Sequence, residues 1–207
     1  LHFRGYLLSK ILGILLVCVI AWLLPSLHIL KFSYITVLLG ILCCALVSLT
    51  IFVTRRKEFL GYIKKNWSSL LLLEAFFLAA FFIFLLIRMA NPDLWHPYRG
   101  GEKPMDLAYL NAVLKSSYMP PYDPWFAGGY MNYYYWGQFI IASLVHLTGI
   151  PTQLSYNLSI PTLFALTAGA SFTIGASIIN NVGRKKSLYV AFGVLAFILV
   201  CVAGKIG

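Results

Sequence analysis

Long apolar runs are the feature that most restricts what this chain can fold into. Six of them approach or exceed the roughly 20 residues that a helix needs to cross a bilayer. Inside lipid the backbone must satisfy its own hydrogen bonds, and the alternation of a β-barrel strand is absent. The runs predict an all-α, polytopic transmembrane helical bundle with segments at about 9–27, 33–54, 67–89, 134–150, 158–179 and 188–203.

Composition excludes a soluble domain. The 207 residues are 60% hydrophobic and 11% charged, with a mean hydropathy of +0.83, too little polar material to cover a water-exposed surface. The net charge of +10 is best explained by Lys and Arg at helix ends facing anionic membrane lipids, so nucleic acid is not an expected partner. The four cysteines lie in apolar runs without metal-ligand spacing, and no metal site is predicted from them.

Charge asymmetry suggests how the chain is oriented and divided. The stretch 55–66 carries five Lys or Arg residues against one Glu, which predicts a cytoplasmic loop closing an N-terminal region 1–66. The remainder, 67–207, forms a membrane core whose outer loop, about 90–133, is then non-cytoplasmic. By the same parity the basic turn 183–187 falls outside, against the positive-inside rule. Either one segment is re-entrant or the fold overrides the local charge.

The outer loop holds most of the polar chemistry. A Pro followed by apolar residues at helical spacing predicts a short amphipathic helix over 105–117, lying in the membrane interface. Asp106 falls in its first turn, where a carboxylate either stabilises the positive end of the helix or acts as a general base beside Glu102. Arg99 and Lys103 flank these acids and are suited to a lipid-carrier phosphate or to anionic headgroups.

Aromatic residues gather where the loop meets the next apolar run. Tyr133, Tyr134, Tyr135 and Trp136 are typical of an interfacial belt, and they could also stack on sugar rings. Two polar residues lie inside apolar runs. Glu74 predicts either a buried partner or an interfacial position, and His146 is more typical of a packed histidine than of a ligand.

The loop also carries a family resemblance. The string GGEKPMDLAYLNAVLKSSYMPPYDPWFAGGYMNYYYWGQ, together with RGYLLSKILGILLV near the start, closely resembles the YYY family of uncharacterised polytopic membrane proteins, which is named for a triple tyrosine. The likeness covers essentially the whole chain. Because members of that family are much longer, the chain resembles their N-terminal part.

The YYY proteins in turn resemble C-type (GT-C) glycosyltransferases, which use polyprenyl-phosphate-linked sugars. In those enzymes an acidic residue stands on a short juxtamembrane helix of the first outer loop, where Met105–Tyr109 falls here. They also have a basic external turn where Gly183–Lys186 falls, which favours the fold overriding the charge rule. They often carry two adjacent acids, whereas Asp106 is followed by Leu107, so that Glu102 is the nearest second acid.

This resemblance implies inverting transfer of a sugar from a polyprenyl-phosphate carrier to an acceptor at the non-cytoplasmic face. Asp106 and Glu102 would be the catalytic residues, and some related enzymes use a divalent cation. Arg99, Lys103 and the four aromatic residues would bind substrate. The setting would be the plasma membrane of a prokaryote, in contact with lipids and in a membrane protein complex.

Two other functions fit parts of the sequence. A transporter or flippase of lipid-linked sugars would use paired charges inside the membrane and broken helices, for which Glu74, His146 and Pro161 are the candidates. A non-catalytic scaffold subunit would use the aromatic loop to bind lipid or protein. The concentration of polar groups at one membrane face favours the enzyme.

Overall fold

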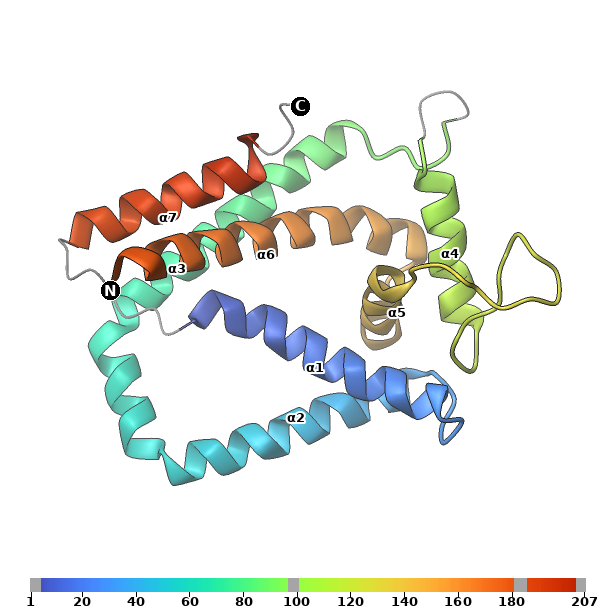
Figure 1. Ribbon diagram of the computed structural model, residues 1–207, viewed down its shortest axis with the longest axis horizontal. Coiled ribbons are helices and arrows are strands. Elements are labelled where there is room, and N and C mark those ends of the chain that lie inside the picture. Colours follow the sequence, from blue (N-terminus) through green and yellow to red (C-terminus); the bar gives the residue numbers. More distant parts are fainter. Residues whose placement is uncertain (1–4, 97–100, 181–185, 204–207) are drawn as a thin grey trace. The chain divides into compact units, whose positions relative to one another are not determined.

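The computed structural model describes residues 5–96, 101–180 and 186–203, and these fold as helices and connecting loops (Figure 1). An isolated bridge between Tyr122 and Tyr130 is the only β-type pairing among them. The helices are α1 (Tyr6–Ser26), α2 (Tyr34–Thr54), α3 (Arg56–Ala90), α4 (Lys103–Lys115), α5 (Trp136–Thr148), α6 (Thr152–Asn180) and α7 (Lys186–Cys201). The all-α membrane fold expected from the sequence is confirmed.

Four helices in the described ranges are long and apolar enough to cross a membrane: α1, α2, α3 and α6. The other two apolar helices are shorter, and α5 has only 13 residues. At 1.5 Å per residue α5 is about 20 Å long, against roughly 30 Å of hydrocarbon. The segment expected to be the fourth crossing is therefore a helix too short to span the bilayer on its own.

The chain divides into two compact units. Unit 1 comprises 1–12, 54–90 and 160–207, and unit 2 comprises 13–53 and 91–159. The outer loop belongs to unit 2 together with α2 and most of α1, whereas α3 belongs to unit 1.

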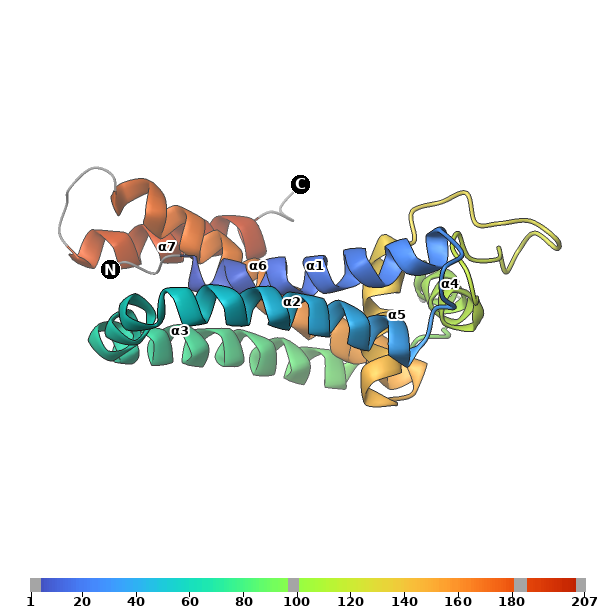
Figure 2. The same cartoon turned by 90° about the horizontal axis from the view of Figure 1, so that it is seen from below.

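Unit 1 brings α7 against the second half of α6, and the two helices lie side by side in Figures 1 and 2. Gly175 is the point of closest approach. A Cβ added there would lie 2.7 Å from the carbonyl oxygen of Phe192 and 2.5 Å from the Cβ of Ala196. The small-residue spacing of Ser171 and Gly175 thus marks a helix-packing face, because small side chains let two backbones approach closely.

A charged pair joins α1 and α3 within unit 1. The Nζ of Lys10 lies 2.8 Å from Oε1 of Glu74, and the hydroxyl of Tyr6 donates a hydrogen bond to the same oxygen. The Lys10 ammonium also lies 5.0 Å from the ring centroid of Phe77, where the ring face attracts a cation. The sequence left Glu74 either with a partner or at the interface, and the structure supplies the partner.

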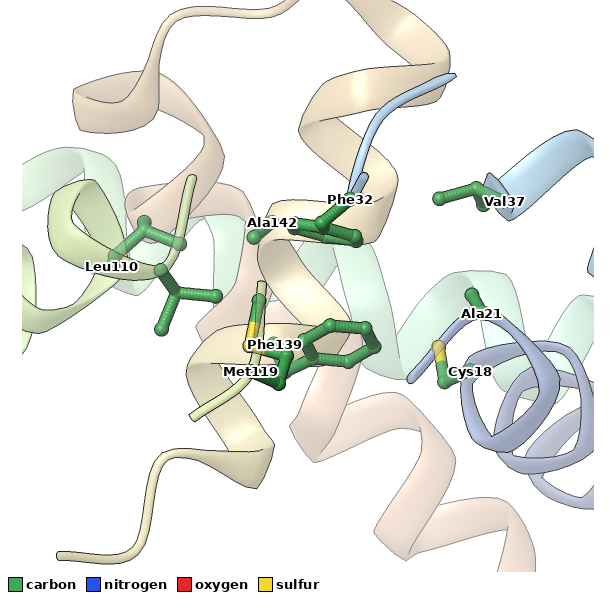
Figure 3. Close-up of a cluster of buried hydrophobic side chains, with 9 residues drawn as sticks. Cys18, Ala21, Phe32, Val37, Leu110, Met119, Phe139 and Ala142 are labelled. Atoms are coloured by element: carbon green, nitrogen blue, oxygen red, sulfur yellow. The ribbon is translucent and has the colours of Figure 1, made fainter. Parts of the chain in front are cut away.

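Unit 2 has an apolar core to which α1, the α1–α2 connection, α4 and α5 all contribute (Figure 3). Phe32, in the connection, stacks on Phe139 of α5 with ring centroids 4.6 Å apart and meets the His146 ring edge-on at 4.7 Å. His146 is therefore a packed histidine, as expected. The remaining buried members are Cys18, Ala21, Val37, Leu110, Val113, Met119 and Ala142.

Contacts within unit 2 define where α5 ends and where α6 begins. Gly149 ends α5 in the left-handed conformation with φ of 69°, which lets the chain reverse into α6. The side-chain amide of Asn157, early in α6, then donates to the carbonyl oxygen of Pro92 at 3.1 Å. Pro92 follows the end of α3 by two residues. The start of α6 is thus tied to the first residues of the outer loop.

Candidate functional site

The site is built on α4, which begins at Lys103 rather than at 105 and so confirms the predicted helix with a small shift. Pro104 stands in its first turn, where the missing amide hydrogen costs nothing. Tyr109, Leu110 and Val113 are its buried residues. Asp106 precedes them by three, four and seven positions and therefore lies on the same face of the helix. Its carboxylate is turned toward neighbouring helices rather than toward open water.

Two neutral donors hold the Asp106 carboxylate. The hydroxyl of Tyr156, from α6, donates to Oδ2 at 3.1 Å, and the side-chain amide of Gln138, from α5, donates to Oδ1 at a longer 3.4 Å. All three side chains are half-buried. Within the described ranges no basic side chain forms an ion pair with Asp106. The carboxylate is thus oriented by dipoles from two other helices, and its charge is not cancelled there.

Glu102 has a different setting. It occupies the N-cap position of α4, where its backbone carbonyl accepts the amide of Asp106 at 2.9 Å, but its exposed side chain makes no capping hydrogen bond. Lys103 donates from Nζ to the backbone carbonyl of Asp93 at 3.3 Å. Arg99 lies outside the described residues. Glu102, Lys103 and Asp106 therefore lie at or within the first turn of α4, and of these three only Asp106 has side-chain hydrogen-bond partners in the described part of the chain.

The triple tyrosine divides into two halves. Tyr133 and Tyr134 are 46% and 68% exposed, and the Tyr133 hydroxyl donates to the Tyr134 hydroxyl at 2.8 Å. That hydrogen bond, with smaller contributions including the Glu102 carboxylate, raises the pKa of Tyr133 to about 12. The Tyr133 ring also lies 5.9 Å from the ring of Tyr109 on α4. These two exposed side chains are available to a ligand near the start of α4.

Tyr135 and Trp136 face the core instead. The indole nitrogen of Trp22 donates to the Tyr135 hydroxyl at 3.0 Å. Trp136 stacks on Phe139 at 5.6 Å and meets Trp22 edge-on at 6.0 Å. Both are half-buried against the unit 2 cluster. Their contacts connect α5 to α1, which is a packing role.

The donor set does not fit a divalent cation. In the described part of the chain no three His, Cys, Asp or Glu side chains come close enough to hold a metal ion. No catalytic step through a metal is derived from these residues.

Sequence reasoning did not identify Gln138 and Tyr156. Each is a polar side chain near the start of an apolar run, three residues after Tyr135 and four after Thr152 respectively. That position is a usable signal, because a polar group at the start of an apolar helix often faces the bundle interior. Their common target, Asp106, emerges only from the packing of α4 on α5 and α6.

The fold and the apolar helices define an integral, multi-pass membrane protein. Residues 16–207 match the family described as uncharacterized membrane protein (DUF2298), and the chain belongs to that family. Searches of curated proteins and of solved structures found no match to the chain.

Proposed function

We propose that this protein is a membrane glycosyltransferase that transfers a sugar from a polyprenyl-phosphate carrier to an acceptor at the non-cytoplasmic face. The observation that carries this proposal is the Asp106 carboxylate, oriented by Tyr156 and Gln138 and lacking a cationic partner among the described residues. A general base needs a fixed direction and an available lone pair. An ionised carboxylate has about four acceptor sites, and the two hydrogen bonds leave others for a substrate hydroxyl.

The proposed reaction inverts the anomeric carbon. The acceptor oxygen forms a bond to that carbon as its bond to the carrier phosphate breaks, and the hydroxyl proton passes to Asp106. Lys103 and Arg99 would stabilise the charge on the leaving phosphate. Tyr133 remains neutral, because its pKa is about 12. Its hydrogen is donated to Tyr134, so the Tyr133 hydroxyl can accept from a sugar hydroxyl while the exposed Tyr134 hydroxyl donates to a sugar oxygen.

A four-crossing topology supports this sidedness. If 55–66 is cytoplasmic, α3 runs outward, α4 and α5 stay at the outer face, and α6 returns inward. Arg184 and Lys185 then follow α6 on the cytoplasmic side, in agreement with the positive-inside rule. The short α5 therefore favours the re-entrant explanation of the basic turn over an override by the fold.

Cysteine labelling tests that topology. With the four native cysteines replaced, Thr148→Cys should react with a membrane-impermeant reagent added outside, and Gly183→Cys only after the membrane is opened. The reverse pattern would mean that α5 crosses the membrane and that α6 does not begin at the outer face.

The residues that would support the transporter alternative already have partners within the protein. Glu74 is ion-paired to Lys10 at 2.8 Å and accepts a hydrogen bond from Tyr6, so its charge is already compensated. His146 packs edge-on against Phe32. Neither group is arranged along a path for a charged substrate.

The transferase proposal is tested in the host by deleting the full-length gene and restoring wild type, Asp106→Asn or Asp93→Asn. Asp93→Asn is the matched control, the same substitution in the same outer segment. Envelope glycolipids and glycoproteins are compared by mass spectrometry at equal protein level. Loss of a sugar modification that wild type and Asp93→Asn restore, but Asp106→Asn does not, supports the proposal. Full restoration by Asp106→Asn would leave Asp106 a structural helix-end charge and favour the scaffold alternative.

A further inference from the structure

A cavity in unit 2 lies on the side of α4 away from Asp106. It has a volume of about 380 Å³ and is formed between the last turns of α4 and the loop that follows. Its α4 residues recur at the spacing of a single helix face, opposite to the buried face that carries Asp106. It is therefore distinct from the proposed transfer centre. The lining residues are Ala108, Asn111, Ala112, Lys115, Ser116, Tyr122, Asp123 and Pro124.

The cavity is held open by hydrogen bonds, so a ligand would find it formed. The Ser116 hydroxyl donates to the carbonyl of Ala112 at 2.8 Å and accepts the backbone amide of Tyr122 at 3.1 Å, which ties the loop to the end of α4. Tyr122 pairs with Tyr130 across the loop, and their rings stack 5.2 Å apart. A preformed site lowers the entropy cost of binding.

The polar groups of the cavity match hydroxyl groups. Oδ1 of Asp123 accepts the amide of Trp125, and the Asn111 amide donates to the carbonyl of Leu107. Within the described ranges, Oδ2 of Asp123, Oδ1 of Asn111 and Nζ of Lys115 have no hydrogen-bond partner. The site thus offers two acceptors and one donor, and a hydroxyl can both donate and accept.

Charge excludes an anion or a cation as the preferred ligand. Lys115 contributes one positive charge and Asp123 one negative charge, so a phosphate would face a carboxylate and an amine would face an ammonium. The Tyr122 ring adds an apolar wall supported by Tyr130. Ligand sites are commonly apolar with a few convergent polar groups, and this volume is at the small end of their range.

We infer that this cavity binds a neutral saccharide. The apolar wall would contact the C–H face of a sugar ring, while Asp123, Asn111 and Lys115 exchange hydrogen bonds with its hydroxyls. The assignment of that saccharide as part of the transferase acceptor rests on the proposed function. The binding of a saccharide in this cavity does not depend on it. The proposed acceptor would be held on α4 away from Asp106, with its reactive hydroxyl reaching around the helix.

Calorimetric titration of the full-length protein in lipid nanodiscs tests the inference. The probes are maltotriose and mannotriose as neutral saccharides, with glucose 6-phosphate as the anionic comparison. At least one neutral probe should bind more tightly than glucose 6-phosphate. Tyr122→Ala and Asn111→Ala should each weaken it by about tenfold. Trp95→Ala, which removes an exposed aromatic residue outside the cavity, should not change it. Two independent variants guard against misfolding of either one.

Three results would contradict the saccharide site, and one would contradict only the transferase proposal. Absence of binding by both neutral probes at millimolar concentration, a preference for glucose 6-phosphate, or undiminished binding by both cavity variants would overturn the saccharide site. Asp106→Asn should bind the probe normally. If Asp106→Asn also restores envelope glycosylation in the host, the transferase proposal fails while the saccharide site stands.

Discussion

Each of the two units has a carboxylate on a helix, and the surroundings of the two carboxylates are opposite in charge character. Glu74 in unit 1 is paired with Lys10 and hydrogen-bonded by Tyr6, so its negative charge is matched by a positive one. Asp106 in unit 2 receives hydrogen bonds only from the neutral groups of Tyr156 and Gln138 among the described residues.

This difference distinguishes a carboxylate that stabilises the fold from one that is available for catalysis. A carboxylate neutralised by an adjacent ammonium contributes to helix association and has little charge left for chemistry. One oriented by neutral dipoles keeps its charge and its direction, which is how preorganised sites are made. Substitutions at the two acids should therefore have different consequences, one for stability and one for activity.

The largest effect is expected from Asp106→Asn. The amide keeps the shape of the carboxylate and can still accept from Tyr156, but it cannot take a proton. Sugar transfer should fall by about 10²–10⁴-fold, the usual contribution of one positioned base. The thermal transition of the purified protein should change little. Equal losses of activity and stability would make Asp106 a structural acid like Glu74 and remove the contrast.

Glu74→Ala should act on stability. It leaves the Lys10 ammonium without its partner; such a change costs about 3–5 kcal/mol for a fully buried pair. Because the two side chains are 30% and 29% exposed, we expect roughly 1–3 kcal/mol. Unfolding in detergent or nanodiscs measures it. The double variant Lys10→Met with Glu74→Met should regain most of the loss, and failure to regain it would mean that the pair is not what joins α1 to α3.

Close helix approaches offer a test that should give the same result in both units. Gly175→Ala would drive a methyl group against the Phe192 carbonyl, and Gly40→Ala would place one 2.7 Å from the carbonyl oxygen of Val17. Each should cost about 1–3 kcal/mol through overpacking. Gly13→Ala, which meets nothing within 4 Å, is the matched control and should be neutral or slightly stabilising. A neutral result at either close approach would mean that those helices can separate freely.

The smallest effects on stability are expected from Tyr→Phe substitutions, and they should differ between Tyr135 and Tyr133. Tyr135→Phe leaves the Trp22 indole without its acceptor and should destabilise the protein by about 1 kcal/mol. Tyr133→Phe removes only an exposed hydroxyl and its hydrogen bond to Tyr134, and the free energy of unfolding should change by no more than about 0.5 kcal/mol. Thermal denaturation compares the two variants. Equal effects would contradict the division of the triple tyrosine into a packed half and an exposed half.

Much of this protein could be read from the order of residue types. The apolar runs predicted six crossing segments, and four of them are helices long and apolar enough to span a membrane. Pro104 with its amphipathic successors predicted α4. Asp106 was identified as the principal acid for its place on that helix. By contrast, 134–150 was expected to cross the bilayer, because hydropathy cannot distinguish a spanning helix from one that Gly149 ends after 13 residues.

The sequence by itself determined the membrane fold, the helix-forming segments and the loop that holds the polar groups, because these follow from hydrophobicity and local propensity. Only the tertiary structure decided which polar groups meet. Tyr156 is 50 residues from Asp106, and Glu74 is 64 residues from Lys10. Partners so distant in sequence are chosen by helix packing, which local patterns do not encode. That packing gave one acid an ammonium and the other two neutral donors.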